Sequence, residues 1–128
     1  NNTVKNPETE LGKLRIWLID NDENVLNALK QLLQNWGCDI ATATGLAQLQ
    51  ALQAKLPVPQ LLIIDYQLDD GITGLDVIRE AKLCHLPIIV NTANHDEVIR
   101  EKVLDAGYPL LYKPLKAPAL KRMIKRLT

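Results

Sequence analysis

Short, uninterrupted apolar runs alternate with longer amphipathic segments along almost the whole chain, and this alternation indicates the class of fold. The apolar runs predict strands at residues 14–20, 38–44, 61–65, 87–92 and 109–113. Apolar residues that recur every three or four positions predict helices after them, at 25–36, 46–56, 74–83, from a cap at Asn94 to near Gly107, and 117–127. Strands without polar alternation are typical of parallel sheets that are buried on both faces. The sequence therefore predicts five βα units.

Five parallel strands with right-handed crossovers place helices on both faces of one sheet. The most economical arrangement is an α/β, flavodoxin-like, doubly wound (βα)5 sandwich of three layers, with strand order 2-1-3-4-5. The length of 128 residues suits one such domain. Residues 1–13 are polar, contain a proline and lack periodicity, so we expect a linker there and the domain at 14–128.

Four of the predicted strands end in side chains that can take part in chemistry, namely Asp20, Asp65, Thr92 and Lys113. The carboxyl ends of parallel strands lie at one edge of the sheet, so we expect these four groups to converge. Two close carboxylates raise each other's pKa unless a cation lies between them. A hard divalent ion such as Mg²⁺ meets that need, because it prefers oxygen ligands. The set suits phosphoryl transfer, with Asp65 as the nucleophile.

These features resemble the receiver domain of two-component signalling, the response regulator family. The resemblance covers roughly residues 14–127, and it rests on the cluster at 20–22, on Asp65, on Thr92–Ala93 and on Lys113–Pro114. Four longer segments are similar to those of C-terminal receiver domains in hybrid sensor histidine kinases, namely IDND, NWGC, DYQLDDGITGLD and KPLKAPAL.

The resemblance implies a phosphoacceptor and a magnesium site. Asp65 would accept a phosphoryl group from the phosphohistidine of a partner. The implied ligands of Mg²⁺ are Asp20, Asn21, Asp65 and the backbone carbonyl of Gln67, with Asp22 as a further candidate.

The resemblance also implies a switch. Thr92 would turn toward the new phosphoryl oxygens and Lys113 would pair with them, while the small Ala93 leaves the path open. The Lys113–Pro114 peptide bond is cis in that family. The switching face would comprise the fourth helix, the fifth strand and the fifth helix, where Leu110 stands in place of the usual aromatic residue.

The chain departs from the family pattern at three places. Asn21 stands where most receivers have a second acid that binds the metal directly. Asp69 replaces the usual proline four residues after the phosphoacceptor, and the loop DDGITG is one residue longer than usual. Leu110 replaces the switching aromatic. The first departure predicts weak binding of Mg²⁺, and the last predicts that a shift of the fourth helix carries the signal.

Two other functions stay open at the level of sequence. The segment IDND supplies a DxD pattern like that of haloacid-dehalogenase-type phosphatases, whose nucleophile would be Asp20. That alternative leaves Asp65 without a role and lacks an acidic pair after the fourth strand. A degenerate receiver that acts as a protein-interaction scaffold is the other alternative, supported by Asn21. As an isolated domain, we expect at most self-phosphorylation and autodephosphorylation at Asp65.

Composition narrows the partners. Lysine plus arginine and aspartate plus glutamate both number 15, so the balanced charge argues against direct binding of nucleic acid. No apolar run approaches the length of a membrane span, so we expect no membrane contact by this domain. The expected partner is a phosphohistidine-bearing kinase or phosphotransfer domain. We expect the domain to be a monomer or a weak dimer and to lie in the cytoplasm. We also expect it to be a piece of a longer hybrid histidine kinase, with the cytoplasmic part of a membrane sensor kinase as one form of that context.

Overall fold

A computed structural model describes residues 11–128 and shows one parallel sheet of five strands. The strands are β1 (Arg15–Ile19), β2 (Asp39–Ala43), β3 (Leu61–Asp65), β4 (Ile88–Thr92) and β5 (Leu110–Tyr112). They lie in the order β2-β1-β3-β4-β5. The predicted doubly wound fold and strand order are therefore confirmed.

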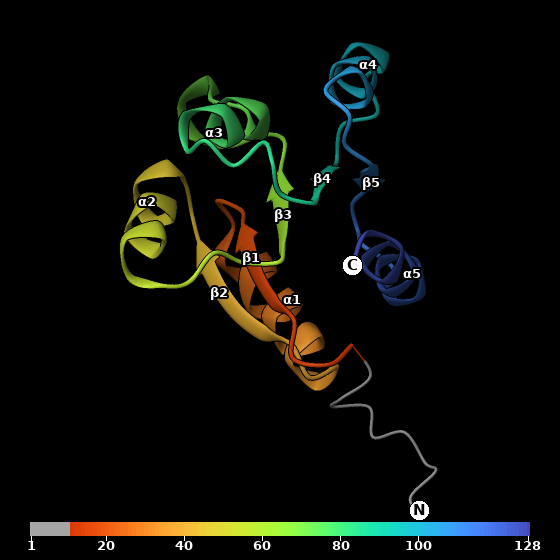
Figure 1. Ribbon diagram of the computed structural model, residues 1–128. Coiled ribbons are helices and arrows are strands. Elements are labelled where there is room, and N and C mark those ends of the chain that lie inside the picture. Colours follow the sequence, from red (N-terminus) through yellow and green to blue (C-terminus); the bar gives the residue numbers. More distant parts are fainter. Residues whose placement is uncertain (1–10) are drawn as a thin grey trace, which may run out of the picture.

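Helices cover both faces of the sheet and complete the three layers (Figure 1). One face carries α1 (Glu23–Asn35) and α5 (Ala117–Leu127). The other face carries α2 (Leu46–Lys55), α3 (Gly74–Glu80) and α4 (Glu97–Asp105). Within residues 11–128, none of these helices is long and apolar enough to cross a membrane.

Alternation along the strands decides which face each site residue occupies. In β1, Ile16 and Leu18 join the core under α1 and α5, whereas Trp17 and Ile19 join the opposite core. Alternate residues of a strand point to opposite faces. By the same alternation, the face of α1 and α5 receives the side chains at the ends of four strands, Asp20, Asp65, Asn91 and Lys113. Thr92 follows Ile88 and Val90 onto the other face.

Several helix ends differ from the predicted ones, by up to three residues, and those of α3 and α4 have an identifiable cause. The predicted capping box of α3 is present, with Thr73 and Asp76 bonding to each other's backbone N–H groups. However, α3 ends at Glu80 because Lys82 takes a left-handed backbone conformation with φ of 59°.

The predicted cap of α4 at Asn94 is wrong. The carboxylate of Asp96 caps this helix by accepting from the N–H of Val98. The side chain of Asn94, two residues before the cap, accepts instead from the N–H of Asp96. Both residue types cap helices well, so the choice rests on local geometry that the sequence does not display.

Residues 1–10 of the predicted linker lie outside the described residues. Leu11, which the prediction also places in the linker, donates its backbone N–H to the carbonyl of Trp36 at 3.1 Å. Its side chain packs, partly buried, against the core under α1 and α5. Contact with the domain therefore begins at least as early as Leu11.

Candidate functional site

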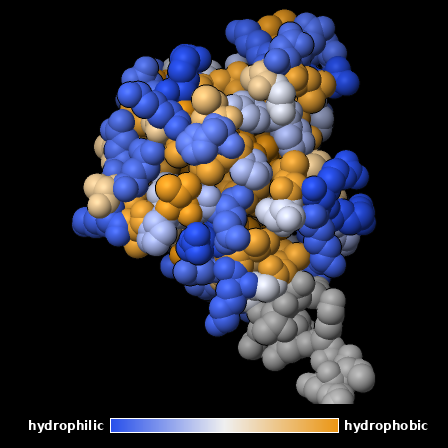
Figure 2. All heavy atoms as spheres, in the orientation of Figure 1, coloured by the Kyte–Doolittle hydropathy of each residue, from blue (hydrophilic) through white to orange (hydrophobic). Residues whose placement is uncertain are grey.

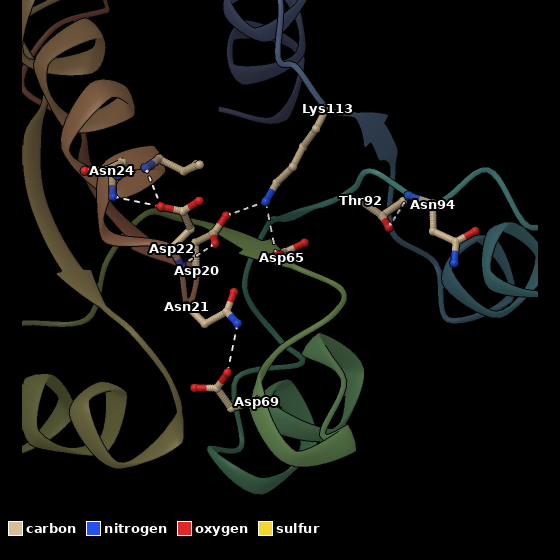
Figure 3. A network of polar contacts seen from close by, with 10 residues as sticks. Asp20, Asn21, Asp22, Asn24, Asp65, Asp69, Thr92, Asn94 and Lys113 are labelled. Atoms are coloured by element: carbon tan, nitrogen blue, oxygen red, sulfur yellow. Dashed lines mark hydrogen bonds and ion pairs between the residues drawn. The ribbon is translucent and has the colours of Figure 1, made fainter.

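Two buried carboxylates share one lysine at the carboxyl edge of the sheet (Figure 3). Asp20 follows β1 with 3 % of its surface exposed, and Asp65 ends β3 with 6 % exposed. The Nζ atom of Lys113, which follows β5, donates to Asp20 Oδ2 at 2.7 Å and to Asp65 Oδ2 at 3.1 Å. The structure thus brings together three of the predicted site residues from three different strands.

The shared lysine does not neutralise both acids. Burial raises the pKa of Asp65 and the negative charge of Asp20 raises it further, against the opposing effect of Lys113. Burial lowers the pKa of Lys113, but its hydrogen bond to Asp20 and the charges of both carboxylates raise that pKa overall. The ammonium therefore stays protonated, and the pocket keeps an excess of negative charge.

The loop after β1 is organised by its own polar groups. Asp20 Oδ1 accepts from the backbone N–H of Asp22 at 2.9 Å. The side chain of Asp22, the further metal candidate, accepts from the N–H groups of Asn24 and Val25 and so caps α1. A capping role therefore accounts for this acid, as it does for many acids at helix starts.

Asn21 bridges to the loop after β3. Its Nδ2 donates to Asp69 Oδ1 at 2.9 Å. Figure 3 shows the amide nitrogen turned toward Asp69 and the amide oxygen turned toward the side on which Asp20 and Asp65 lie. An amide oxygen is therefore presented near the carboxylate pair.

Thr92 lies at the same edge, but the structure does not bond it to the carboxylates. Its Oγ1 accepts from the backbone N–H of Asn94 at 3.0 Å, and the residue is fully buried. Three residues further on, the ring of His95 stacks on that of Tyr112, with centroids 4.1 Å apart and planes inclined by 10°. This stack joins the loop after Thr92 to the residue before Lys113.

An apolar groove of about 460 Å³ lies beside the carboxylates. It is lined by α1 and by the segments after β4 and β5, through Val25, Ala28, Leu29, Leu32, Asn91, Ala93, Lys113, Pro114 and Leu115. The Lys113–Pro114 peptide bond in its wall is cis, the isomer that the resemblance implies. Asn91 is 2 % exposed, and within the described chain its Oδ1 has no hydrogen-bond partner.

The donor atoms at this edge suit a hard cation. They are the carboxylate oxygens of Asp20 and Asp65 and the amide oxygen of Asn21. The backbone N–H of Gln67 bonds to the Asp65 carboxylate, so the backbone of Gln67 lies beside that carboxylate. Within residues 11–128 there is no cluster of three or more His, Cys, Asp or Glu side chains able to hold a metal. A metal here would therefore need neutral oxygens, which Mg²⁺ accepts as waters, amides or carbonyls.

Sequence reasoning missed three features of this site. Gly74 begins α3 directly against Asp65, and a Cβ atom there would lie 2.5 Å from the Asp65 carbonyl oxygen. Asn91 reads as part of an apolar strand, although it pairs in register with Asp65. Asp69 reads as a turn residue, although it binds Asn21. Each depends on a contact between distant segments, so no local pattern announces it.

The doubly wound sheet, with an acid pair and a lysine at its carboxyl edge, defines a receiver-type signalling domain. A family model of the response regulator receiver domain matches residues 16–125, so the chain belongs to this family of two-component signalling. Receiver domains interact with histidine kinases or phosphotransfer partners.

Two curated proteins show similar sequences. The chain is 34 % identical to the aerobic respiration control sensor protein ArcB of Escherichia coli, over 91 % of this chain and 15 % of that protein. It is 30 % identical to the C4-dicarboxylate transport transcriptional regulatory protein DctD of Pseudomonas aeruginosa, over 90 % of this chain and 25 % of that protein. The chain thus spans a quarter or less of these relatives.

Solved receiver structures have the same fold. A response regulator receiver protein from Burkholderia phymatum superposes with a TM-score of 0.78 at 26 % identity, covering 90 % of this chain and 94 % of that one. A receiver protein from Pseudomonas putida gives a TM-score of 0.80 at 23 % identity, covering 90 % of this chain and 98 % of that one. At that identity, the similarity shows only that the fold is shared.

Proposed function

We propose that this domain is the phosphoacceptor module of a phosphorelay, and that Asp65 receives the phosphoryl group. The observation that carries the proposal is the shared contact of Lys113 with Asp65 and Asp20 at the end of the central strand. An oxygen of Asp65 attacks the phosphorus of a partner's phosphohistidine, the phosphorus–nitrogen bond breaks, and the imidazole leaves. The product is an aspartyl phosphate.

The residues around Asp65 divide the remaining work. Lys113 already contacts the Asp65 carboxylate at 3.1 Å, so its ammonium is in place to pair with an incoming phosphoryl oxygen. Asp20, Asp65, the Gln67 carbonyl and the Asn21 amide oxygen would hold Mg²⁺. A bound Mg²⁺ supplies neutralisation of the charge that gathers on the phosphoryl oxygens.

Two surfaces support the exchange of signals with partners. The apolar groove beside Lys113 offers a place for the domain that carries the phosphohistidine. On the other side, α4 exposes Val98 and Leu104, at 56 % and 44 %, and buries fully only Val103. Figure 2 shows hydrophobic residues at the surface in the region of α4. A helix held by few buried side chains can shift when the loop after Thr92 moves.

The whole-protein context that we propose is a hybrid histidine kinase in the cytoplasm or on its side of a membrane. The similarity to the sensor protein ArcB supports this context, whereas the similarity to DctD, a transcriptional regulator by name, supports another. The balanced charge favours a relay without direct contact to DNA. The phosphatase alternative is not favoured, because the matching family has its phosphoacceptor at the end of the third strand, where Asp65 stands, and not at the position of Asp20.

Treatment with acetyl phosphate and Mg²⁺, followed by mass spectrometry, tests the proposal. We expect one phosphoryl group on Asp65, lost in Asp65→Asn and retained in Asp39→Asn, which removes an exposed acid at the opposite end of the sheet. Undiminished labelling of Asp65→Asn would overturn the assignment. Turnover of phosphoesters through Asp20 would support the phosphatase, and a chain that takes up no phosphate at all would support the scaffold.

A further inference from the structure

We propose that Asp69 is a positioning residue of the metal site, and that it acts by holding the Asn21 amide with its oxygen toward Asp20 and Asp65. The proposal rests on the proposed function, because it concerns the same Mg²⁺ site. It adds a residue from the loop after β3 that stands where a proline is usual in the family. The geometry behind it is the single hydrogen bond from Asn21 Nδ2 to Asp69 Oδ1, at 2.9 Å.

An amide ligand needs orientation in a way that a carboxylate does not. A carboxylate presents an oxygen whichever way it is turned, but an amide turned by half a rotation presents two N–H donors instead. Those donors would repel a cation. An ionised carboxylate only accepts hydrogen bonds, so Asp69 pairs with the nitrogen of Asn21 and selects the orientation with the oxygen toward the acid pair.

Asp69 also supplies, near the metal site, the negative charge that an acid at position 21 would carry and that the Asn21 amide does not. Asn21 occupies a position where an acid would add one charge to the site, and the Asp69 carboxylate lies one hydrogen bond away. A hydrogen bond to an ionised acceptor polarises the donor group, which makes the amide oxygen a better ligand. The pair of residues therefore does the work of one acid.

The backbone around Asp69 is tied down enough for such a role. The Asp69 carbonyl accepts from the N–H of Ile72 at 3.1 Å, and the Ile72 carbonyl accepts from the N–H of Leu68 at 3.1 Å. Asp69 also starts the short 3-10 turn Asp69–Gly71. These bonds fix the approach of the loop to Asn21, so that the contact does not depend on a freely moving side chain alone.

The neighbouring acid provides a matched control. Asp70 carries the same charge one residue further on and, within residues 11–128, has no recorded hydrogen bond to Asn21. Its φ of 61° lies in the left-handed region, where asparagine is well tolerated. Asp69→Ala removes one charge together with the partner of Asn21, whereas Asp70→Asn removes one charge and leaves that partner in place.

The test is titration of the full chain with MgCl2 by calorimetry. We expect Asp69→Ala to weaken Mg²⁺ binding about tenfold, the lower end of losses seen when a partner of a metal ligand is removed. Asp70→Asn should change it by less than about twofold. In the Asn21→Asp background, Asp69→Ala should cost little, because a carboxylate ligand needs no orienting partner. An equal loss in both backgrounds would overturn the positioning role.

A second readout works without metal. In the unaltered chain the side-chain NH2 resonances of Asn21 should report a hydrogen bond to a carboxylate, and they should move to water-exposed values in Asp69→Ala. Phosphoryl labelling of the same variants distinguishes a failure of the proposed phosphoacceptor function from a failure of the positioning role of Asp69. If the unaltered chain binds no Mg²⁺ and takes no phosphate, both proposals fall. If it does both while Asp69→Ala binds Mg²⁺ as Asp70→Asn does, only the present inference falls.

Discussion

Gly74 gives the sharpest structural prediction, because α3 begins in direct contact with the strand end that carries Asp65. The backbone N–H of Gly74 donates to the carbonyl of Tyr66 at 2.7 Å. A Cβ atom at this position would lie 2.5 Å from the carbonyl oxygen of Asp65, 3.3 Å from its carbonyl carbon and 3.4 Å from a side-chain atom of Ile64. Glycine therefore allows the helix and the strand to meet.

The cost of Gly74→Ala follows from these distances. Ordinary contact begins near 3.4 Å, so the two backbones must separate by about 0.9 Å, the difference between 3.4 and 2.5 Å. The two closest atoms, the carbonyl oxygen and carbon of Asp65, belong to the backbone, so no movement of a flexible side chain relieves the clash. Overpacking of this kind costs about 1–3 kcal/mol. For a chain of this size, that lowers the melting temperature by about 3–15 °C. The same separation moves Asp65 relative to Lys113, so phosphoryl labelling should slow as well.

Thermal unfolding followed by circular dichroism measures the first effect, and labelling by acetyl phosphate measures the second. The matched control is Gly45→Ala, because Gly45 also stands at the start of a helix, has extended backbone with φ of −178°, and would place its Cβ with nothing within 4 Å. Equal melting temperatures and equal labelling rates for the two variants would refute the argument from close contact.

Three further predictions concern charge and switching. Asn21→Asp should tighten binding of Mg²⁺ about tenfold, or roughly 1.4 kcal/mol, by adding a charge to the site, and calorimetry that finds no change would place Asn21 outside the metal shell. Asp65→Asn should stabilise the metal-free fold at neutral pH by about 0.5–2 kcal/mol, because a carboxyl with raised pKa is destabilising when ionised. That gain should shrink as pH falls through the raised pKa toward 3.8, since the folded chain then takes up the proton first; melting curves across the pH range show it, and a gain that grows toward acid contradicts it. Beryllofluoride, a phosphoryl mimic, should shift the ring resonances of His95 and Tyr112 and the amides of α4 in NMR spectra, and shifts confined to the strand-end pocket would contradict the switch.

The sheet could be predicted because its determinants are local. An apolar run such as 61–65 is fully buried on both sides, and the register then follows from which residues face each core. The acid that ends this run was equally visible, since Asp65 is its only charged residue. The convergence of Asp20, Asp65 and Lys113 followed from topology once the strands were placed in parallel.

The remaining features depend on contacts that cross between loops. The bond from Asn21 to Asp69 joins segments 48 positions apart, and nothing in either loop indicates which way the amide turns. Asn94 and Asp96 compete as caps of α4, and alternative caps differ by only about 1 kcal/mol, so a small geometric preference decides. Asn91 lies in a strand that its apolar neighbours predict. Only the structure shows that Asn91 pairs in register with Asp65 and that, within the described residues, its Oδ1 atom has no hydrogen-bond partner.

The charges of the pocket argue that phosphoryl transfer and Mg²⁺ binding depend on each other under the proposed function. In the structure, two carboxylates face one ammonium, which leaves one negative charge uncompensated and agrees with the raised pKa of Asp65. Counted over these three side chains, and apart from Asp69, which acts through the Asn21 amide, a divalent cation gives one net positive charge. A phosphoryl group on Asp65 exchanges one negative charge for about two, so the excess becomes about two negative charges, which a divalent cation balances. Mg²⁺ should therefore bind the phosphorylated domain more tightly than the free one. Because such coupling is reciprocal, Mg²⁺ should favour the phosphorylated form by the same factor.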